Sequence, residues 1–122
     1  MSALEPSPEI LEVAIRSARE AGEILMESFG RVSTFARKSS RRDLVTEADF
    51  ASQEAIQRVI GAAFPDHAFI GEEGNGRPPV VTSGQYCWVA DPLDGTLNYT
   101  RQLPNYSVSV ALCHGEQAIC GV

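Results

Sequence analysis

The sequence predicts an α+β fold in which two amphipathic helices pack on a mostly antiparallel sheet. Apolar residues recur at helical spacing up to residue 65, and strand-like apolar runs dominate after residue 85. The two parts show no regular strand–helix–strand alternation, which argues against a parallel α/β fold. The chain has 122 residues, enough for one domain with a real core but not for two.

The composition indicates a globular chain, with 43% hydrophobic and 21% charged residues. A net charge of -6 argues against nucleic acid or an anionic membrane surface as partner. No apolar run has the length of a membrane span, and the N-terminus lacks a signal-peptide pattern. Cys87, Cys113 and Cys120 show no C-x-x-C spacing, so we expect buried free thiols and a cytoplasmic location.

The first helix is expected to start at Ser7-Pro8-Glu9, where a hydroxyl cap precedes proline and an acid, and to end at Gly30. Its apolar face consists of residues at three- and four-residue steps: Ile10, Leu11, Ala14, Ala18, Ala21, Leu25 and Phe29. Val32 to Arg37 alternates loosely and is compatible with a strand. Lys38 to Arg42 is a basic loop, either a solvated one or a mobile lid that brings cations to an anionic ligand.

The second helix is expected to open within Asp43 to Asp49, where Thr46 and Asp49 fit a capping box. Pro65 marks its end. The apolar face is formed by Phe50, Ile56, Val59, Ile60 and Ala63.

The second half is expected to contain strands joined by turns. The expected strands are Ala68–Ile70, Tyr86–Ala90, Tyr106–Leu112 and Gln117–Val122. Between them lie a Gly-flanked acidic pair, Glu72 and Glu73, which on its own is typical of a hairpin tip, and an irregular Gly/Pro-rich stretch. A short helical turn is expected over Leu97–Arg101, and His114 is expected to be a turn residue. Because the chain ends within a strand-like run, we expect a fragment of a longer protein.

The stretch Asp91-Pro92-Leu93-Asp94-Gly95-Thr96 carries the candidate chemistry. A carboxylate at the end of a core strand is costly to desolvate without a partner, and neither Arg77 nor Arg101 is placed to neutralise two acids. A divalent cation can bind both carboxylates and the carbonyl between them. Three acidic clusters, Asp43/Asp49, Glu72/Glu73 and Asp91/Asp94, therefore predict a two-metal phosphate site.

In that site Asp91 would bridge two metals, Asp94 would complete one shell, and Glu72 with the Leu93 carbonyl would complete the other. Gly95 and Thr96 would offer backbone N–H groups to a phosphate. The Thr96 hydroxyl could also help Asp49 to orient an attacking water.

Three segments resemble the inositol monophosphatase family. Asp91 to Tyr99 is similar to its D-P-[IL]-D-G-T-x-N-[FY] signature, Gly71-Glu72-Glu73 to its G-E-E segment, and Asp43 to Asp49 to its D-L-V-T-x-x-D segment. The resemblance implies that residues 1–122 are the N-terminal α+β portion of a layered sugar-phosphatase fold. It also implies Mg²⁺-dependent hydrolysis of a phosphate monoester, with inositol-1-phosphate as the favoured substrate and a homodimer at full length.

The resemblance also implies residue roles. Glu72 and Asp91 with the Leu93 carbonyl would hold one Mg²⁺, and Asp91 and Asp94 would share a second. Asp94, Gly95 and Thr96 would contact the substrate, while Thr96, Asp49 and Glu72 would position the water. Family members carry a further metal-binding Asp in a downstream W-D segment that this chain does not reach, so residues 1–122 alone are expected to be weakly active or inactive, and to expose an apolar sheet edge.

Several alternatives stay open. Within the enzymes, the substrate could be histidinol phosphate, fructose-1,6-bisphosphate or a nucleotide 3′-phosphate rather than inositol-1-phosphate; in every case it is a small phosphorylated compound. Outside the enzymes, the chain could be a non-catalytic metal-binding or partner-binding remnant, or a Ca²⁺-stabilised structural domain.

Overall fold

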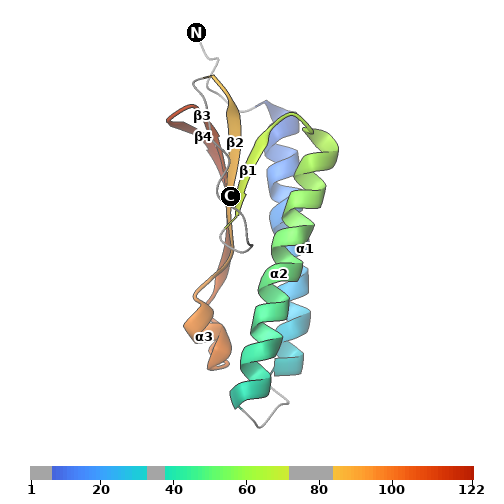
Figure 1. Ribbon diagram of the computed structural model, residues 1–122, viewed down its shortest axis with the longest axis vertical. Coiled ribbons are helices and arrows are strands. Elements are labelled where there is room, and N and C mark those ends of the chain that lie inside the picture. The colour runs from blue at the N-terminus through green and yellow to red at the C-terminus, as the bar shows by residue number, and fades with distance from the viewer. Residues whose placement is uncertain (1–6, 33–37, 72–83) are drawn as a thin grey trace.

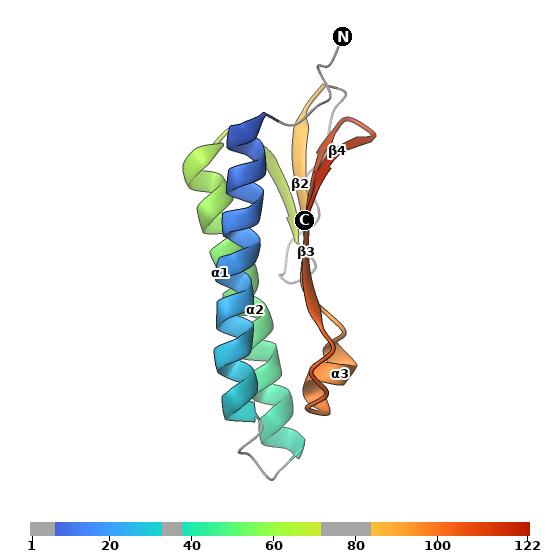
Figure 2. The ribbon, with the colours of Figure 1, turned by 180° about the vertical axis from the view of Figure 1, so that it is seen from behind.

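The computed structural model describes residues 7–32, 38–71 and 84–122. Two long helices, α1 (Pro8–Val32) and α2 (Lys38–Ala63), form one layer, and strands β1 (Ala68–Gly71), β2 (Tyr86–Asp94), β3 (Ser107–His114) and β4 (Gln117–Gly121) form the other. Figures 1 and 2 show both helices on the same side of the sheet, with the short helix α3 (Thr96–Thr100) at its far end. This confirms the predicted α+β class. No helix within the described ranges is long and apolar enough to cross a membrane.

Helix α1 starts as predicted, because the Ser7 hydroxyl accepts a hydrogen bond from the Ile10 N–H at 3.2 Å. It runs to Val32, two residues beyond the predicted stop at Gly30. The prediction that Leu11 faces the core is wrong, since its side chain is 40% exposed and Val13 is buried instead.

Helix α2 begins earlier than predicted, at Lys38, so the expected basic loop at 38–42 is wrong. The capping role of Thr46 is also wrong. Thr46 lies inside the helix, and its Oγ1 donates to the Arg42 carbonyl at 3.0 Å, the usual bond of a hydroxyl in a helix interior. Val45 and Ala48 are buried against α1 and α3 residues, and such packing stabilises helical turns that lack a cap signal. Phe50, predicted to be apolar core, is 45% exposed. Apart from Val32, which is helical, the possible strand at 32–37 lies outside the described residues.

The sheet has the order β1-β2-β3-β4. β1 pairs with β2 in parallel, and β2/β3 and β3/β4 pair antiparallel. β2 is longer than expected: it continues past Ala90 through the acidic stretch to Asp94, with a register irregularity between Asp91 and Asp94. The expected helical turn (α3) and the returning strand (β4) are both present.

Two buried clusters hold the layers together. The larger one joins both helices to Trp88 of β2 and Leu112 of β3. At its rim the Trp88 indole N–H donates to His67 Nδ1 at 3.0 Å. The His67 ring is stacked on Tyr86, which in turn stacks on His114 at 4.4 Å. The prediction that His114 is a turn residue is wrong, because His114 is the last residue of β3.

The smaller cluster contains Leu25, Val45, Ala48, Leu93 and Tyr99, and anchors the end of β2 and α3 to the helices. The Tyr99 hydroxyl donates to the Leu25 carbonyl at 2.7 Å. Burial, reinforced by the neighbouring Tyr106, raises the pKa of Tyr99 to about 12, so its proton stays in this bond at neutral pH. The cluster therefore fixes the position of the acidic stretch relative to α1 and α2.

Candidate functional site

The candidate site is built on the turn from β2 into α3. Leu93 is buried in the smaller cluster, whereas Asp91 is partly exposed and Asp94 is exposed. The Leu93 N–H donates to Asp91 Oδ1 at 3.2 Å, and the Thr96 hydroxyl donates to the Leu93 carbonyl at 3.0 Å. Two hydrogen bonds thus hold one carboxylate oxygen and one carbonyl oxygen in a single turn.

The Asp91 carboxylate and the Leu93 carbonyl can each still bind a cation. A carboxylate has two oxygens with about four lone-pair positions, and a backbone carbonyl has two lone pairs. The hydrogen bonds from Leu93 and Thr96 occupy one position on each group. Oxygen atoms of this type are the ligands that Mg²⁺ prefers, so the donor set of Asp91, Leu93 and Asp94 fits a hard cation.

Gly95 makes the turn possible. It precedes α3 with φ 90° and ψ 36°, in the left-handed region that only glycine adopts without strain. A Cβ at this position would lie 2.9 Å from the carbonyl oxygen of Asn105 and 3.2 Å from Tyr106 Cα. The backbone of the next loop therefore packs directly against the glycine.

Asp49 reaches this region from α2. Its side chain is 7% exposed, and its charge contributes to the raised pKa of Tyr99, which places the two groups near each other. Helix α2 contacts α3 directly, and Figures 1 and 2 show α3 beside the N-terminal half of α2. The fold therefore brings Asp49 to the same end of the molecule as the turn.

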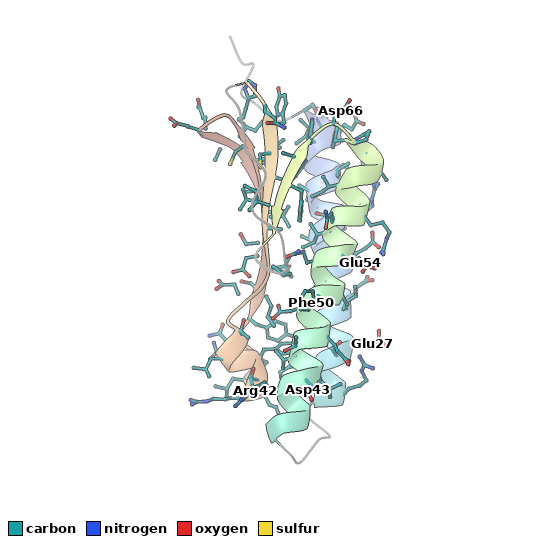
Figure 3. All side chains as sticks on the ribbon, in the orientation of Figure 1. Glu27, Arg42, Asp43, Phe50, Glu54 and Asp66 are labelled. Atoms are coloured by element: carbon teal, nitrogen blue, oxygen red, sulfur yellow. The ribbon has the colours of Figure 1, made fainter. Side chains whose placement is uncertain are left out.

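Asp43 does not join Asp49 as the predicted acidic cluster requires. The two residues are six positions apart in the helix, which amounts to about 9 Å along the axis and a rotation of about 240°. Asp43 is exposed near the N-terminal end of α2 (Figure 3). Asp49 is buried. The predicted acidic partner Glu72, with Glu73, lies outside the described residues. Within the described ranges, no group of three or more His, Cys, Asp or Glu side chains could hold a metal ion.

Sequence reasoning missed the residues that support the site. Tyr99 belongs to the signature stretch, but only the structure shows its bond to α1. Gln53 lies one turn after Asp49, and its side chain lies where a Cβ on Gly71 would be, so the end of β1 lies against α2 just before Glu72. Nothing in the sequence around Gln53 signals this contact.

The chain is similar to known proteins along almost its whole length. The model of the inositol monophosphatase family matches residues 7–122. The chain is 39% identical over 119 residues to a protein of Aquifex aeolicus named fructose-1,6-bisphosphatase/inositol-1-monophosphatase, covering 97% of this chain and 44% of that protein. It is 38% identical over 103 residues to a Pseudomonas aeruginosa protein named Nus factor SuhB, covering 84% and 38%.

Solved structures of this family have the same fold as the chain. An inositol monophosphatase from Anabaena superposes with a TM-score of 0.71 at 30% identity, covering 100% of this chain and 39% of that one. The extragenic suppressor protein SuhB of Bartonella henselae gives a TM-score of 0.77 at 27% identity, covering 93% and 42%. The chain thus spans about two fifths of the length of these relatives. By sequence and by fold, the chain belongs to the inositol monophosphatase family.

Proposed function

We propose that the protein hydrolyses phosphate monoesters with Mg²⁺, and that its substrate is inositol-1-phosphate. The observation that carries the proposal is the turn in which Asp91 and the Leu93 carbonyl are held by hydrogen bonds from Leu93 and Thr96. The family supports a phosphatase, and the oxygen donors of the turn support a hard cation.

In this proposal Glu72, Asp91 and the Leu93 carbonyl would hold one Mg²⁺, and Asp91 and Asp94 would contribute to a second. When bound, Mg²⁺ would supply positive charge for the phosphoryl oxygens and a coordinated water of lowered pKa. The remaining roles belong to side chains and backbone of the chain itself.

The hydroxyl proton of Thr96 is already used in a hydrogen bond, which limits the role of this residue. The hydroxyl donates to the Leu93 carbonyl, so its oxygen can act only as an acceptor, for example from an attacking water. Asp49, together with Glu72, would orient that water and take up its proton. The backbone N–H groups of Gly95 and Thr96 and the side chain of Asp94 would contact the substrate.

The test uses the whole protein. Asp91→Asn preserves shape but removes the charge, so it should lower kcat/KM for inositol-1-phosphate by at least about 10²-fold and weaken Mg²⁺ binding in a calorimetric titration. Asp66→Asn is the matched control, because Asp66 is an exposed acid at the opposite end of the molecule (Figure 3). Equal activity of Asp91→Asn and wild type would refute the assignment.

A substrate panel tests the finer claim. Inositol-1-phosphate should show a higher kcat/KM than fructose-1,6-bisphosphate, histidinol phosphate or a nucleotide 3′-phosphate. A higher kcat/KM for one of these compounds would change the proposed substrate but leave the proposed phosphatase activity intact. If the protein bound Mg²⁺ and inorganic phosphate but hydrolysed no ester, the non-catalytic alternative would be favoured. Binding of Ca²⁺ alone would favour a structural domain.

The proposal extends to surroundings and partners. The ligand is a small phosphorylated polyol or sugar, with no nucleic acid or membrane partner, and the whole protein is a cytoplasmic homodimer in which residues 1–122 form one unit. We propose that residues 1–122 by themselves hydrolyse phosphate esters weakly or not at all. Strong Mg²⁺-dependent turnover by this portion would contradict that part.

A further inference from the structure

Two free cysteines lie opposite each other on the sheet face that points away from α1 and α2. Cys87 of β2 and Cys113 of β3 are register partners, and both thiols are free. Trp88 and Leu112, their neighbours in sequence, belong to the core cluster beneath the helices. Because side chains alternate along a strand, Cys87 and Cys113 share the other face. Figure 2 shows that both long helices cover only one face.

Backbone pairing determines how far apart the two residues are. The Gly115 N–H donates to the Gln85 carbonyl at 3.1 Å, which makes Gln85–Gly115 a hydrogen-bonded pair. Pair types alternate along an antiparallel ladder, so Cys87–Cys113, two residues further, is also hydrogen-bonded. The Cα atoms of such pairs lie about 5.5 Å apart, within the range of about 4.4–6.8 Å found in disulfides.

The Cβ atoms are slightly too far apart for an unstrained bond. They lie about 5.5 Å apart in a hydrogen-bonded pair, compared with about 3.5–4.5 Å in disulfides, so the two strands would have to approach by about 1 Å. Strain of this kind makes a disulfide easier to reduce, which favours a reversible bond over a permanent cross-link.

The two thiols differ in access. Cys87 is 2% exposed, and its Sγ–H donates to the Trp88 carbonyl at 3.6 Å, whereas Cys113 is only half-buried. Burial, and secondarily the nearby Cys113, raises the pKa of Cys87. Within residues 1–122 Cys113 is the more exposed of the two thiols, so we expect it to react with an oxidant first and Cys87 second.

We propose that Cys87 and Cys113 form a reversible redox pair that hydrogen peroxide converts to a cross-strand disulfide. The Cys113 thiolate attacks the peroxide, the O–O bond breaks, and a sulfenic acid and one water form. The Cys87 sulfur then attacks the sulfenic sulfur; the S–S bond forms as the S–O bond breaks, and the second water leaves with the Cys87 proton. Two thiols lose two electrons, and one peroxide is reduced to two waters.

The third cysteine provides an internal control. Cys120 is the register partner of Leu112 and packs against the core beneath the helices, so it lies on the opposite face from the pair. It should not exchange with either member while the sheet is folded.

The experiment treats the whole folded protein with hydrogen peroxide, blocks remaining thiols with iodoacetamide under denaturing conditions, and maps peptides by mass spectrometry. The expected product is a Cys87–Cys113 linked peptide that has lost two hydrogens, is reversed by dithiothreitol, and forms unchanged in Cys120→Ser. In Cys87→Ser, Cys113 should stop at a sulfenic acid that dimedone traps.

Peroxide that leaves both thiols open to alkylation, or that links Cys120 to either one in the folded protein, would overturn the proposal. The peptide map of the wild type decides the question even if a serine variant fails to fold. The outcome is independent of the phosphatase proposal, because it requires neither Mg²⁺ nor turnover.

Discussion

Replacing Gly95 by alanine tests the geometry on which the candidate site depends. At φ 90° and ψ 36°, alanine is strained by about 1–2 kcal/mol from its Cβ alone. The contact at 2.9 Å from the Asn105 carbonyl oxygen adds to this, because backbone on the far side must shift. Alanine also restricts the unfolded chain, which offsets about 0.4–1 kcal/mol. The expected net loss in the free energy of unfolding is about 2 kcal/mol.

Urea unfolding of the whole protein measures this loss. With a slope of about 2 kcal/mol per molar urea, the midpoint should fall by about 1 M while the slope stays constant. Gly61→Ala is the matched control, since Gly61 is exposed within α2 with nothing within 4 Å of a Cβ. It should gain about 0.5–1 kcal/mol from better helix propensity. If Gly95→Ala unfolded at the wild-type midpoint while Gly61→Ala was stabilised, the described turn would be wrong.

Three further predictions follow from other parts of the structure. Gly71→Ala would place a Cβ against the amide end of the Gln53 side chain, which must then move, so its effect on stability should depend on Gln53 by at least about 0.5 kcal/mol. Additive effects of Gly71→Ala and Gln53→Ala in urea unfolding would contradict the contact. Leu25→Ala, at a fully buried position, should cost about 2–5 kcal/mol, whereas Met26→Ala, 71% exposed, should change stability by less than about 0.5 kcal/mol. Burial lowers the pKa of His67 below 6.5, opposed by Asp66, so the folded state disfavours the protonated ring. The contribution of neutral His67 to the free energy of unfolding should be fully present above pH 6.5. It should fall as the pH drops toward the lowered pKa, because the unfolded state binds more protons there. His67→Gln should remove this pH dependence in thermal melts recorded across the same range.

Features set by neighbouring residues were predictable. The apolar pattern that marks the strands after residue 85 is a local signal, and their type was correct, although β2 continues to Asp94. The hydrogen bonds of Leu93 to Asp91 and of Thr96 to Leu93 are likewise local. The start of α2 could not be predicted from the sequence. Thr46 resembles a cap, and its role depends on whether the preceding turn is helical. Burial of Val45 and Ala48 against a partner distant in sequence stabilises that turn, and no local pattern reports it.

By itself the sequence determined which oxygen donors stand next to one another, since Asp91, Leu93, Asp94, Gly95 and Thr96 are joined by a few bonds. Only the tertiary structure decided what holds that turn in place and what faces it. The bond from Tyr99 to Leu25 spans 74 residues, and Asp49 arrives on a different helix. The physical reason is that hydrogen-bonding patterns in a turn are local, whereas burial depends on which distant surfaces the chain brings together.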